Sequence, residues 1–224
     1  MIDAELLEFL EGYVTDNRKE LFHKVLEQRT RHFTVVLEDT YQPHNTSAVV
    51  RSCDIFGVQD IYTIEQKFIS KVSKHVARGS QKWLTFHRKK SDGETTEDCF
   101  KELKDKGYQI IGTTPHTDSC ILPDFDISKK TAFVFGAEKE GISDYVKENA
   151  DGFLKVPMVG FTESLNISVA VAIILQDVTT RLRKSDIDWK LSTVEKQELY
   201  AEWIQKTLKN LDKLTEYYHK QLKK

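Results

Sequence analysis

Residues 156–175 read VPMVGFTESLNISVAVAIIL, and this stretch decides the fold. Its first part is predicted to be a loop, because a proline and a glycine interrupt it. The apolar run at 165–175 then predicts a buried helix. Ser164, Asn166 and Ser168 stand at the start of that helix, where backbone N–H groups are free to bind what lies beyond the end. Two interpretations stay open: these side chains only cap the helix, or this junction is the functional site.

Outward from this stretch, short β-rich runs alternate with helical patterns. Strands are predicted at residues 33–37, 60–64, 83–87, 108–113, 131–135 and 152–156. Helices are predicted at two places within 3–29, at 45–56, at 71–78, at 95–106 and from Ser143. Such alternation argues for an α/β fold with a parallel sheet. Ligands of these sheets bind beyond the carboxyl ends of the strands, so the loops after residues 113, 135 and 156 are the expected site.

The C-terminal segment is a separate helical element. A capping box at 192–195 starts it. One apolar stripe then predicts a single long helix that packs onto the body or onto a second subunit: Leu199, Trp203, Leu208, Leu211, Leu214, Tyr218 and Leu222.

The composition indicates a soluble globular protein, with 39% hydrophobic and 30% charged residues among 224. The longest apolar run, 167–175, is too short to cross a bilayer, and no secretion signal is evident. Cys53, Cys99 and Cys120 are odd in number and lack partners at metal-site spacing, which argues against a disulfide framework and a metal site. We expect a cytoplasmic protein with no membrane partner and no metal.

Charge is unevenly distributed, although the net charge is only −2. Residues 66–90, here called the basic stretch, contain Lys and Arg but no Asp or Glu, and aromatic residues lie among them. This pattern favours RNA binding, since cations neutralise phosphates and aromatic rings stack on bases. A solvated basic face is the alternative. The predicted RNA-binding residues are Lys71, Lys74, Arg78, Lys82 and Arg88.

Three polar groups stand on predicted loops or helix starts: Asn45 with Arg51, Glu138 within GAEKEG at 136–141, and Ser164 with Asn166. Each alone is weak evidence. The GAEKEG segment matches neither a Walker loop nor a dinucleotide fingerprint.

Taken in order, three motifs resemble the SPOUT superfamily of RNA methyltransferases, specifically its SpoU/TrmH branch of RNA 2′-O-methyltransferases. They are HNTSAVVRSCD at 44–54 with FGV at 56–58, FGAEKEGIS at 135–143, and VPM at 156–158 with SLNISVA at 164–170. The flanks, LEQR at 26–29, VLED at 36–39, WKLS at 189–192 and Trp203, are similar to the TrmH type, which methylates guanosine 18 of tRNA.

The resemblance implies a parallel-sheet SPOUT fold with a deep C-terminal trefoil knot, flanked by N- and C-terminal helices. The implied domains are a helical extension at 1–30, the methyltransferase domain at 31–183 and a second helical extension at 184–224. A homodimer is implied, with tRNA as partner. S-adenosylmethionine is the implied methyl donor, held largely by backbone groups of Thr113, Gly136, Val156, Met158 and Leu165.

The implied catalytic residues are Arg51, Asn45, Glu138, Ser164 and Asn166, completed across the dimer interface. The resemblance assigns activation of the hydroxyl to Arg51. Because a guanidinium stays protonated, we expect Arg51 to bind the adjacent phosphate and polarise the hydroxyl rather than to act as a base. Asn45 and Asn166 are expected to hold Arg51 and the carboxylate of the donor, Ser164 to orient the ribose, and Glu138 to support the loops.

Three alternatives remain at this point. The same fold could methylate another tRNA ribose or ribosomal RNA. The chain could be a non-catalytic RNA-binding module, or an α/β structural protein that leaves the motifs unexplained. One departure from the family bears on the RNA contact, since Glu163 stands where relatives often carry Gln.

Overall fold

The computed structural model describes residues 3–90, 95–115 and 119–222, and the chain divides into two compact units. The sheet unit is Thr30–Trp189, and the helical unit combines Met1–Arg29 with Lys190–Lys224. The strands are β1 (Phe33–Glu38), β2 (Asp60–Glu65), β3 (Thr85–Lys90), β4 (Gln109–Thr113), β5 (Cys120–Ile121), β6 (Thr131–Phe135) and β7 (Gly152–Lys155). The helices between and after them are α3 (Pro43–Phe56), α4 (Lys74–Ala77), α5 (Thr96–Asp105), α6 (Asp144–Asn149) and α7 (Ile167–Arg183), with 3-10 turns η1 (Ser80–Lys82) and η2 (Leu122–Asp124).

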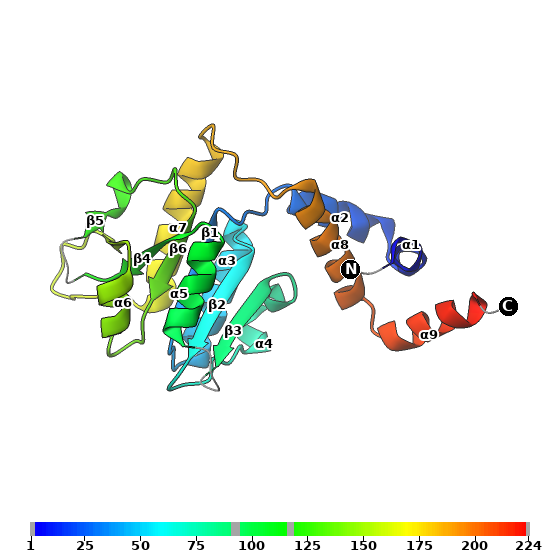
Figure 1. Ribbon diagram of the computed structural model, residues 1–224, viewed down its shortest axis with the longest axis horizontal. Helices are drawn as coiled ribbons and strands as arrows, with labels where there is room; N and C mark the ends of the chain where they lie inside the picture. Colours follow the sequence, from blue (N-terminus) through cyan, green and yellow to red (C-terminus); the bar gives the residue numbers. More distant parts are fainter. Residues whose placement is uncertain (1–2, 91–94, 116–118, 223–224) are drawn as a thin grey trace. The chain divides into compact units, whose positions relative to one another are not determined.

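The sheet unit is built on one seven-stranded sheet in the order β3-β2-β1-β6-β4-β7-β5, with parallel pairing throughout (Figure 1). The predicted parallel α/β sheet is therefore confirmed. β1 is buried along its whole length. Val35 and Leu37 pack with α3 and α7, whereas Val36 packs with α5 and α6. Helices thus cover both faces, which explains why this strand is buried at every position and mostly apolar.

The structure differs from the predicted elements at several ends. β3 begins at Thr85 rather than at 83, because Trp83 still bonds back to Ser80 in the turn after η1. α4 has only four residues, since Arg78 takes a left-handed backbone (φ 53) and ends it. β5 was not expected, and its two residues are too few to give a periodic signal. α7 begins at Ile167 and runs on to Arg183, beyond the predicted end at 175.

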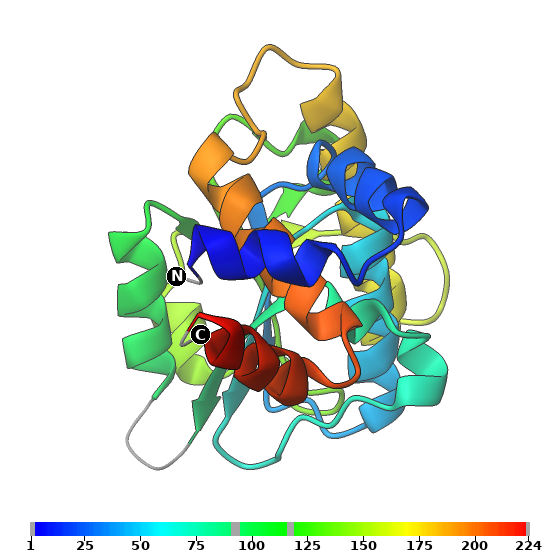
Figure 2. The same cartoon turned by 90° about the vertical axis from the view of Figure 1, so that its right-hand side faces the viewer.

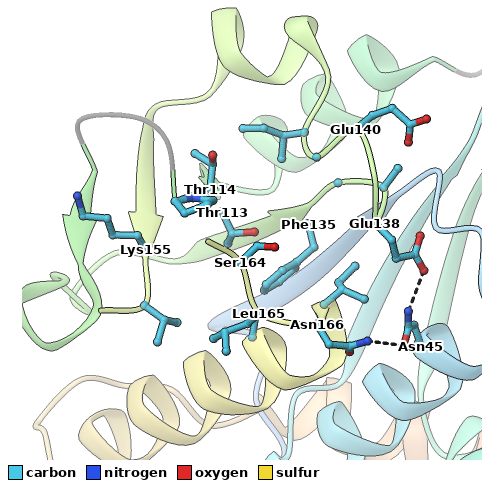
Figure 3. Close-up of a pocket in the computed structure, with 18 of the residues that line it drawn as sticks. Asn45, Thr113, Thr114, Phe135, Glu138, Glu140, Lys155, Ser164, Leu165 and Asn166 are labelled. Atoms are coloured by element: carbon cyan, nitrogen blue, oxygen red, sulfur yellow. Dashed lines mark hydrogen bonds between the residues drawn. The ribbon is translucent and has the colours of Figure 1, made fainter. Parts of the chain in front are cut away.

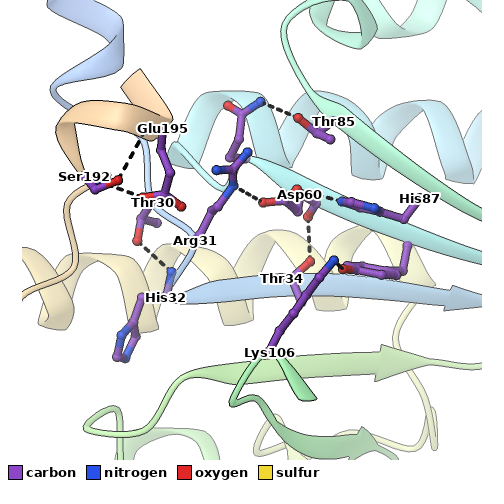
Figure 4. Close-up of polar contacts among 12 residues, drawn as sticks. Thr30, Arg31, His32, Thr34, Asp60, Thr85, His87, Lys106, Ser192 and Glu195 are labelled. Carbon is purple, nitrogen blue, oxygen red and sulfur yellow. Dashed lines mark hydrogen bonds and ion pairs between the residues drawn. The ribbon is translucent and has the colours of Figure 1, made fainter. Parts of the chain in front are cut away.

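A buried carboxylate fixes the amino end of β2. Asp60 accepts hydrogen bonds from Arg31 Nε and His87 Nε2, each 2.8 Å long (Figure 4). Its backbone carbonyl accepts a further bond of 2.7 Å from the Thr34 hydroxyl. Burial alone raises the pKa of Asp60, but the hydrogen bond with His87 and the charge of Arg31 outweigh burial and hold this pKa below its ordinary value. The cluster ties three neighbouring strands together at the end opposite the expected site.

The helical unit contains α1 (Ala4–Glu11), α2 (Asp16–Leu26), α8 (Thr193–Thr207) and α9 (Leu211–Gln221), with α1 in dark blue and α9 in red in Figure 2. The two N-terminal helices and the capping box at Ser192 are confirmed. The single long C-terminal helix is wrong, because Leu208 is extended and separates α8 from α9. The break lets Tyr218 pack on Phe9, with ring centroids 5.2 Å apart. Of the helices described in either unit, none has the length and apolar character needed to cross a bilayer.

Candidate active site

A cavity of about 420 Å³ opens beyond the carboxyl ends of β4, β6 and β7 (Figure 3). Its walls come from the loops that follow these strands and from the starts of α3 and α7, as expected from the sheet type. All five residues predicted to bind the donor line it: Thr113, Gly136, Val156, Met158 and Leu165. We call it the strand-end cavity. Its volume lies within the range of small-molecule sites.

Three side chains from three separate motifs are hydrogen-bonded to one another on the wall of this cavity. Asn45 donates from Nδ2 to Glu138 Oε1 (3.0 Å), and its Oδ1 accepts from Asn166 Nδ2 (3.1 Å) (Figure 3). Asn166 also caps α7, since its Oδ1 accepts from the backbone N–H of Ser168 (2.9 Å). Asn45 is only 3% exposed. The capping interpretation is thus true of Asn166, but its amide group makes a second contact that capping does not require.

Glu138 is an ionised acceptor at this position. Its carboxylate accepts from the backbone N–H groups of Tyr41 (3.2 Å) and Gln42 (3.3 Å) as well as from Asn45. Burial raises the pKa of Glu138, but the Asn45 amide and these backbone donors more than compensate and lower it below the ordinary value. A carboxylate with a lowered pKa is a poor general base at neutral pH. Glu138 is therefore suited to hold the loops together rather than to take a proton.

Gly136 is required by the turn that carries Glu138. A Cβ built on Gly136 would lie 2.0 Å from the carbonyl oxygen of Gly141. The loop closes at this point, because the N–H of Gly141 donates to the carbonyl of Ala137 (2.9 Å). Only a residue without a side chain lets the two backbone segments approach so closely.

The predicted catalytic residues are only partly brought together. Ser164 lines the strand-end cavity with Asn45, Glu138 and Asn166, but Arg51 does not. Arg51 is exposed on α3, and among the described residues it forms no hydrogen bond or ion pair. Glu163 is exposed and does not line the cavity either. In the part of the chain that the structure describes, no group of His, Cys, Asp and Glu is arranged to hold a metal ion.

The five predicted RNA-binding cations are all exposed: Lys71, Lys74, Arg78, Lys82 and Arg88. They lie in and around α4, η1 and β3, and β3 is the edge strand of the sheet. The loop after β2 begins the basic stretch at the same edge of the sheet as the strand-end cavity, because all carboxyl ends of parallel strands point one way.

Several lining residues were missed from the sequence, among them Thr114, Lys139, Glu140 and Lys155. Each lies within a few residues of the carboxyl end of a predicted strand. That position was the available signal, since side chains there converge on one edge of a parallel sheet.

Comparison with known proteins identifies the family of this chain. The model of the SpoU rRNA Methylase family matches residues 32–176. A tRNA (guanosine(18)-2'-O)-methyltransferase of Borreliella burgdorferi is 38% identical over 90% of this chain and 90% of its own length. The solved A. aeolicus TrmH/SpoU tRNA modifying enzyme superposes with a TM-score of 0.76 at 31% identity, covering 86% of this chain and 98% of that one. The SpoU methyltransferase AviRb from Streptomyces viridochromogenes, solved with the cofactor AdoMet, shares the fold at a TM-score of 0.56 and 24% identity, over 72% of this chain and 62% of that one. The chain belongs to the SpoU rRNA Methylase family.

Proposed function

We propose that this chain transfers the methyl group of S-adenosylmethionine to the ribose 2′-hydroxyl of guanosine 18 in tRNA. The observation that carries the proposal is the Asn45–Glu138–Asn166 network on the wall of the strand-end cavity. The likeness to the Borreliella burgdorferi enzyme over nine tenths of both chains supports the choice of nucleotide and of tRNA.

The strand-end cavity suits the methyl donor in size and polarity. Apolar groups of Val156, Met158 and Leu165 offer a surface for an adenine ring, and the Glu138 carboxylate complements the positive charges of the donor. Thr113 contributes its backbone, because its hydroxyl already donates to the Val134 carbonyl (2.9 Å). When bound, the donor would supply a methyl carbon to the ribose 2′-oxygen: the O–C bond would form in line as the S–C bond breaks, the neutral thioether would leave, and the hydroxyl proton would pass to solvent.

The residues of this chain position the acceptor. We propose that Arg51 binds the phosphate beside the target nucleotide and polarises the 2′-hydroxyl, and that Ser164 orients the ribose. The Asn45 and Asn166 amides, held by their mutual hydrogen bond, keep the 2′-hydroxyl and the donor's methyl group aligned, which lowers the entropic cost of the transition state. Glu138 keeps Asn45 and the loop after β1 in place.

We propose a homodimer that completes the site. Arg51 stands outside the strand-end cavity of its own chain. Apolar side chains of the loop before α7 are fully exposed, with Val159 at 104% and Phe161 at 108%, and Val169 and Ile173 on α7 are also exposed. A soluble monomer rarely displays such a group, so a second copy is its expected cover. Arg51 of each chain would then serve the cavity of the other.

The remaining features follow from the family resemblance and stay proposals. We propose that the basic stretch binds tRNA, that residues 31–183 form the methyltransferase domain between helical extensions at 1–30 and 184–224, and that the protein acts in the cytoplasm. We also propose a deep C-terminal trefoil knot, which is supported by the gathering of the loops after β4, β6 and β7 around one cavity.

The test is transfer of radiolabelled methyl to two unmodified tRNA transcripts, one of which carries 2′-deoxyguanosine at position 18. Label in the first transcript alone is the expected result, because only the first offers the acceptor oxygen. Label in both would move the target to another nucleotide. Label in neither, with label in ribosomal RNA fragments, would favour a ribosomal substrate.

A further inference from the structure

A second hollow lies beside the strand-end cavity. It has a volume of about 390 Å³ and is lined by Tyr41, Gln42, Phe68 and residues 137–140. Gln42 and the loop at 137–140, here called the shared loop, also line the strand-end cavity, so the two spaces adjoin. Tyr41 is 65% exposed and Phe68 36% exposed, and their rings meet edge to face with centroids 5.1 Å apart. We call this space the aromatic hollow.

The two aromatic residues stand on loops that are held firmly. Asp39 accepts with Oδ1 from the backbone N–H groups of Gln66 (2.8 Å), Lys67 (2.7 Å) and Phe68 (3.3 Å). Asp39 itself has a left-handed backbone (φ 49), which aims its carboxylate at the loop after β2. On the other side, the Glu138 carboxylate accepts from the backbone N–H of Tyr41. The backbone of both loops is therefore held by hydrogen bonds before anything binds, which lowers the cost of ordering the hollow around a ligand.

Two carboxylates of the shared loop differ in what they contact. Glu138 is engaged by Asn45 and by the backbone of Tyr41 and Gln42. Glu140 is exposed, and within the described residues its carboxylate has no hydrogen bond or ion pair. Figure 3 shows Glu138 pointing toward Asn45 and Glu140 pointing away from it. Glu140 is thus available to accept from a ligand in the aromatic hollow, which it also borders through the loop at 137–140.

We propose that the aromatic hollow receives the base of the target nucleotide, that the rings of Tyr41 and Phe68 pack against it, one on its face and the other on its edge, and that Glu140 identifies it as guanine. This inference rests on the proposed function. Guanine presents the N1–H and the N2 amino group side by side, and one carboxylate accepts from both. Neither adenine nor a pyrimidine offers that pair of donors. Bases that proteins read individually are turned out of the stack and placed on aromatic side chains.

The arrangement also connects base and ribose. Glu138 lines both spaces, and Asn45 is bonded to it. The ribose of a base in the aromatic hollow then enters the strand-end cavity beside Gln42 and Glu138, which line both spaces, so that its 2′-hydroxyl meets the methyl donor near Asn45. The loop at 137–140 thus borders both the space proposed for the base and the cavity proposed for the methyl donor.

The test measures methyl transfer to tRNA transcripts that carry guanosine or inosine at position 18. Inosine keeps N1–H and lacks only the N2 amino group. The wild-type enzyme is expected to prefer guanosine in kcat/KM by about tenfold, the value of a hydrogen bond to a charged group. Glu140→Gln should lower this preference severalfold, because the amide has one acceptor oxygen and cannot accept from both donors as the carboxylate does. Glu148→Gln, on the exposed surface of α6, is the matched control and should keep it.

The stacking residues are tested on the same transcripts. Tyr41→Ala and Phe68→Ala should each lower kcat/KM at least roughly fivefold for both transcripts, the lower end of base–aromatic stacking. Tyr41→Phe should retain activity, since stacking needs only the ring. Calorimetric affinity for S-adenosylmethionine and the thermal midpoint should stay at the wild-type values, which separates a base-binding loss from misfolding.

Two failures can be told apart. If the wild-type enzyme labels the guanosine transcript but the Tyr41, Phe68 and Glu140 variants match it with both transcripts, the base pocket is overturned and the proposed function stands. If the wild-type enzyme labels neither transcript, the proposed function is overturned and this inference with it.

Discussion

The side-chain amide of Asn166 donates a hydrogen bond of 3.1 Å to Oδ1 of Asn45, although the two residues stand 121 positions apart. Asn45 is the central member of the network, because it also donates to Glu138. We predict that Asn45→Ala lowers kcat roughly 100-fold, the usual effect of losing a group that positions the transition state. Single-turnover methyl transfer at saturating donor and tRNA measures this change.

The control for this substitution is Asn149→Ala. Asn149 is exposed on α6, and its amide donates to the Tyr145 carbonyl (2.9 Å) far from the network. It should leave turnover within twofold of wild type. An Asn45→Ala enzyme with wild-type turnover would contradict the central position of Asn45.

Gly136→Ala is predicted to weaken binding of S-adenosylmethionine at least roughly tenfold. The new Cβ would lie 2.0 Å from the backbone oxygen of Gly141, so the loop that lines the strand-end cavity must shift. Titration calorimetry with the donor alone measures the effect. Gly152→Ala is the matched control, because its Cβ meets only the end of the Ile111 side chain at 3.4 Å. Equal affinities for both variants would mean that the loop at 136–141 does not bind the donor.

Local sequence patterns predicted the strands of the sheet well, but they did not predict the break in the C-terminal helix. The run at 33–37 needed no tertiary information, because a strand covered by helices on both faces is mostly apolar and rich in β-branched residues. The break at Leu208 left no such trace, since it depends on the packing of Tyr218 against Phe9. The apolar stripe from Leu199 to Leu222 continues through Leu208, so the sequence pattern alone predicts one uninterrupted helix.

The candidate site shows the same division. Motifs placed Asn45, Glu138 and Asn166 in one cavity, because each stands at the end of a strand or the start of a helix. Spacing could not tell that Arg51 lies outside that cavity. Nor could it find the aromatic hollow, where the Asp39 carboxylate accepts from three backbone N–H groups of the loop after β2.

Asp60→Asn is predicted to destabilise the protein by about 3 kcal/mol at neutral pH, because it leaves Arg31 without its buried charge partner. The pKa of Asp60 is lowered in the folded state. Its stabilising effect is therefore fully present above the ordinary value of 3.8 and is lost as pH falls through the folded pKa. The difference in free energy of unfolding between wild type and variant should therefore shrink as the pH falls below 3.8. Urea unfolding at several pH values measures it.

The control for Asp60→Asn is Asp105→Asn, which removes the exposed ion pair between Asp105 and Lys101 on α5. Exposed pairs contribute little, so its free energy of unfolding should change by less than about 0.5 kcal/mol. The free energy of unfolding of wild type could instead exceed that of Asp60→Asn by the same amount at acid pH. That result would show that Asp60 stabilises the fold through its packing and not through its charge.

Arg51→Ala is predicted to lower turnover roughly 1,000-fold without changing the thermal midpoint, because Arg51 is exposed and forms no ion pair among the described residues. Lysine should restore little, since it lacks the planar fork that binds a phosphate. Mixing Arg51→Ala with Asn45→Ala subunits tests the dimer directly. If Arg51 serves the partner's cavity, each mixed dimer contains one intact site, and random mixing returns about a quarter of wild-type activity. If Arg51 serves its own cavity, both sites of a mixed dimer stay defective, and activity remains at the level of the separate variants.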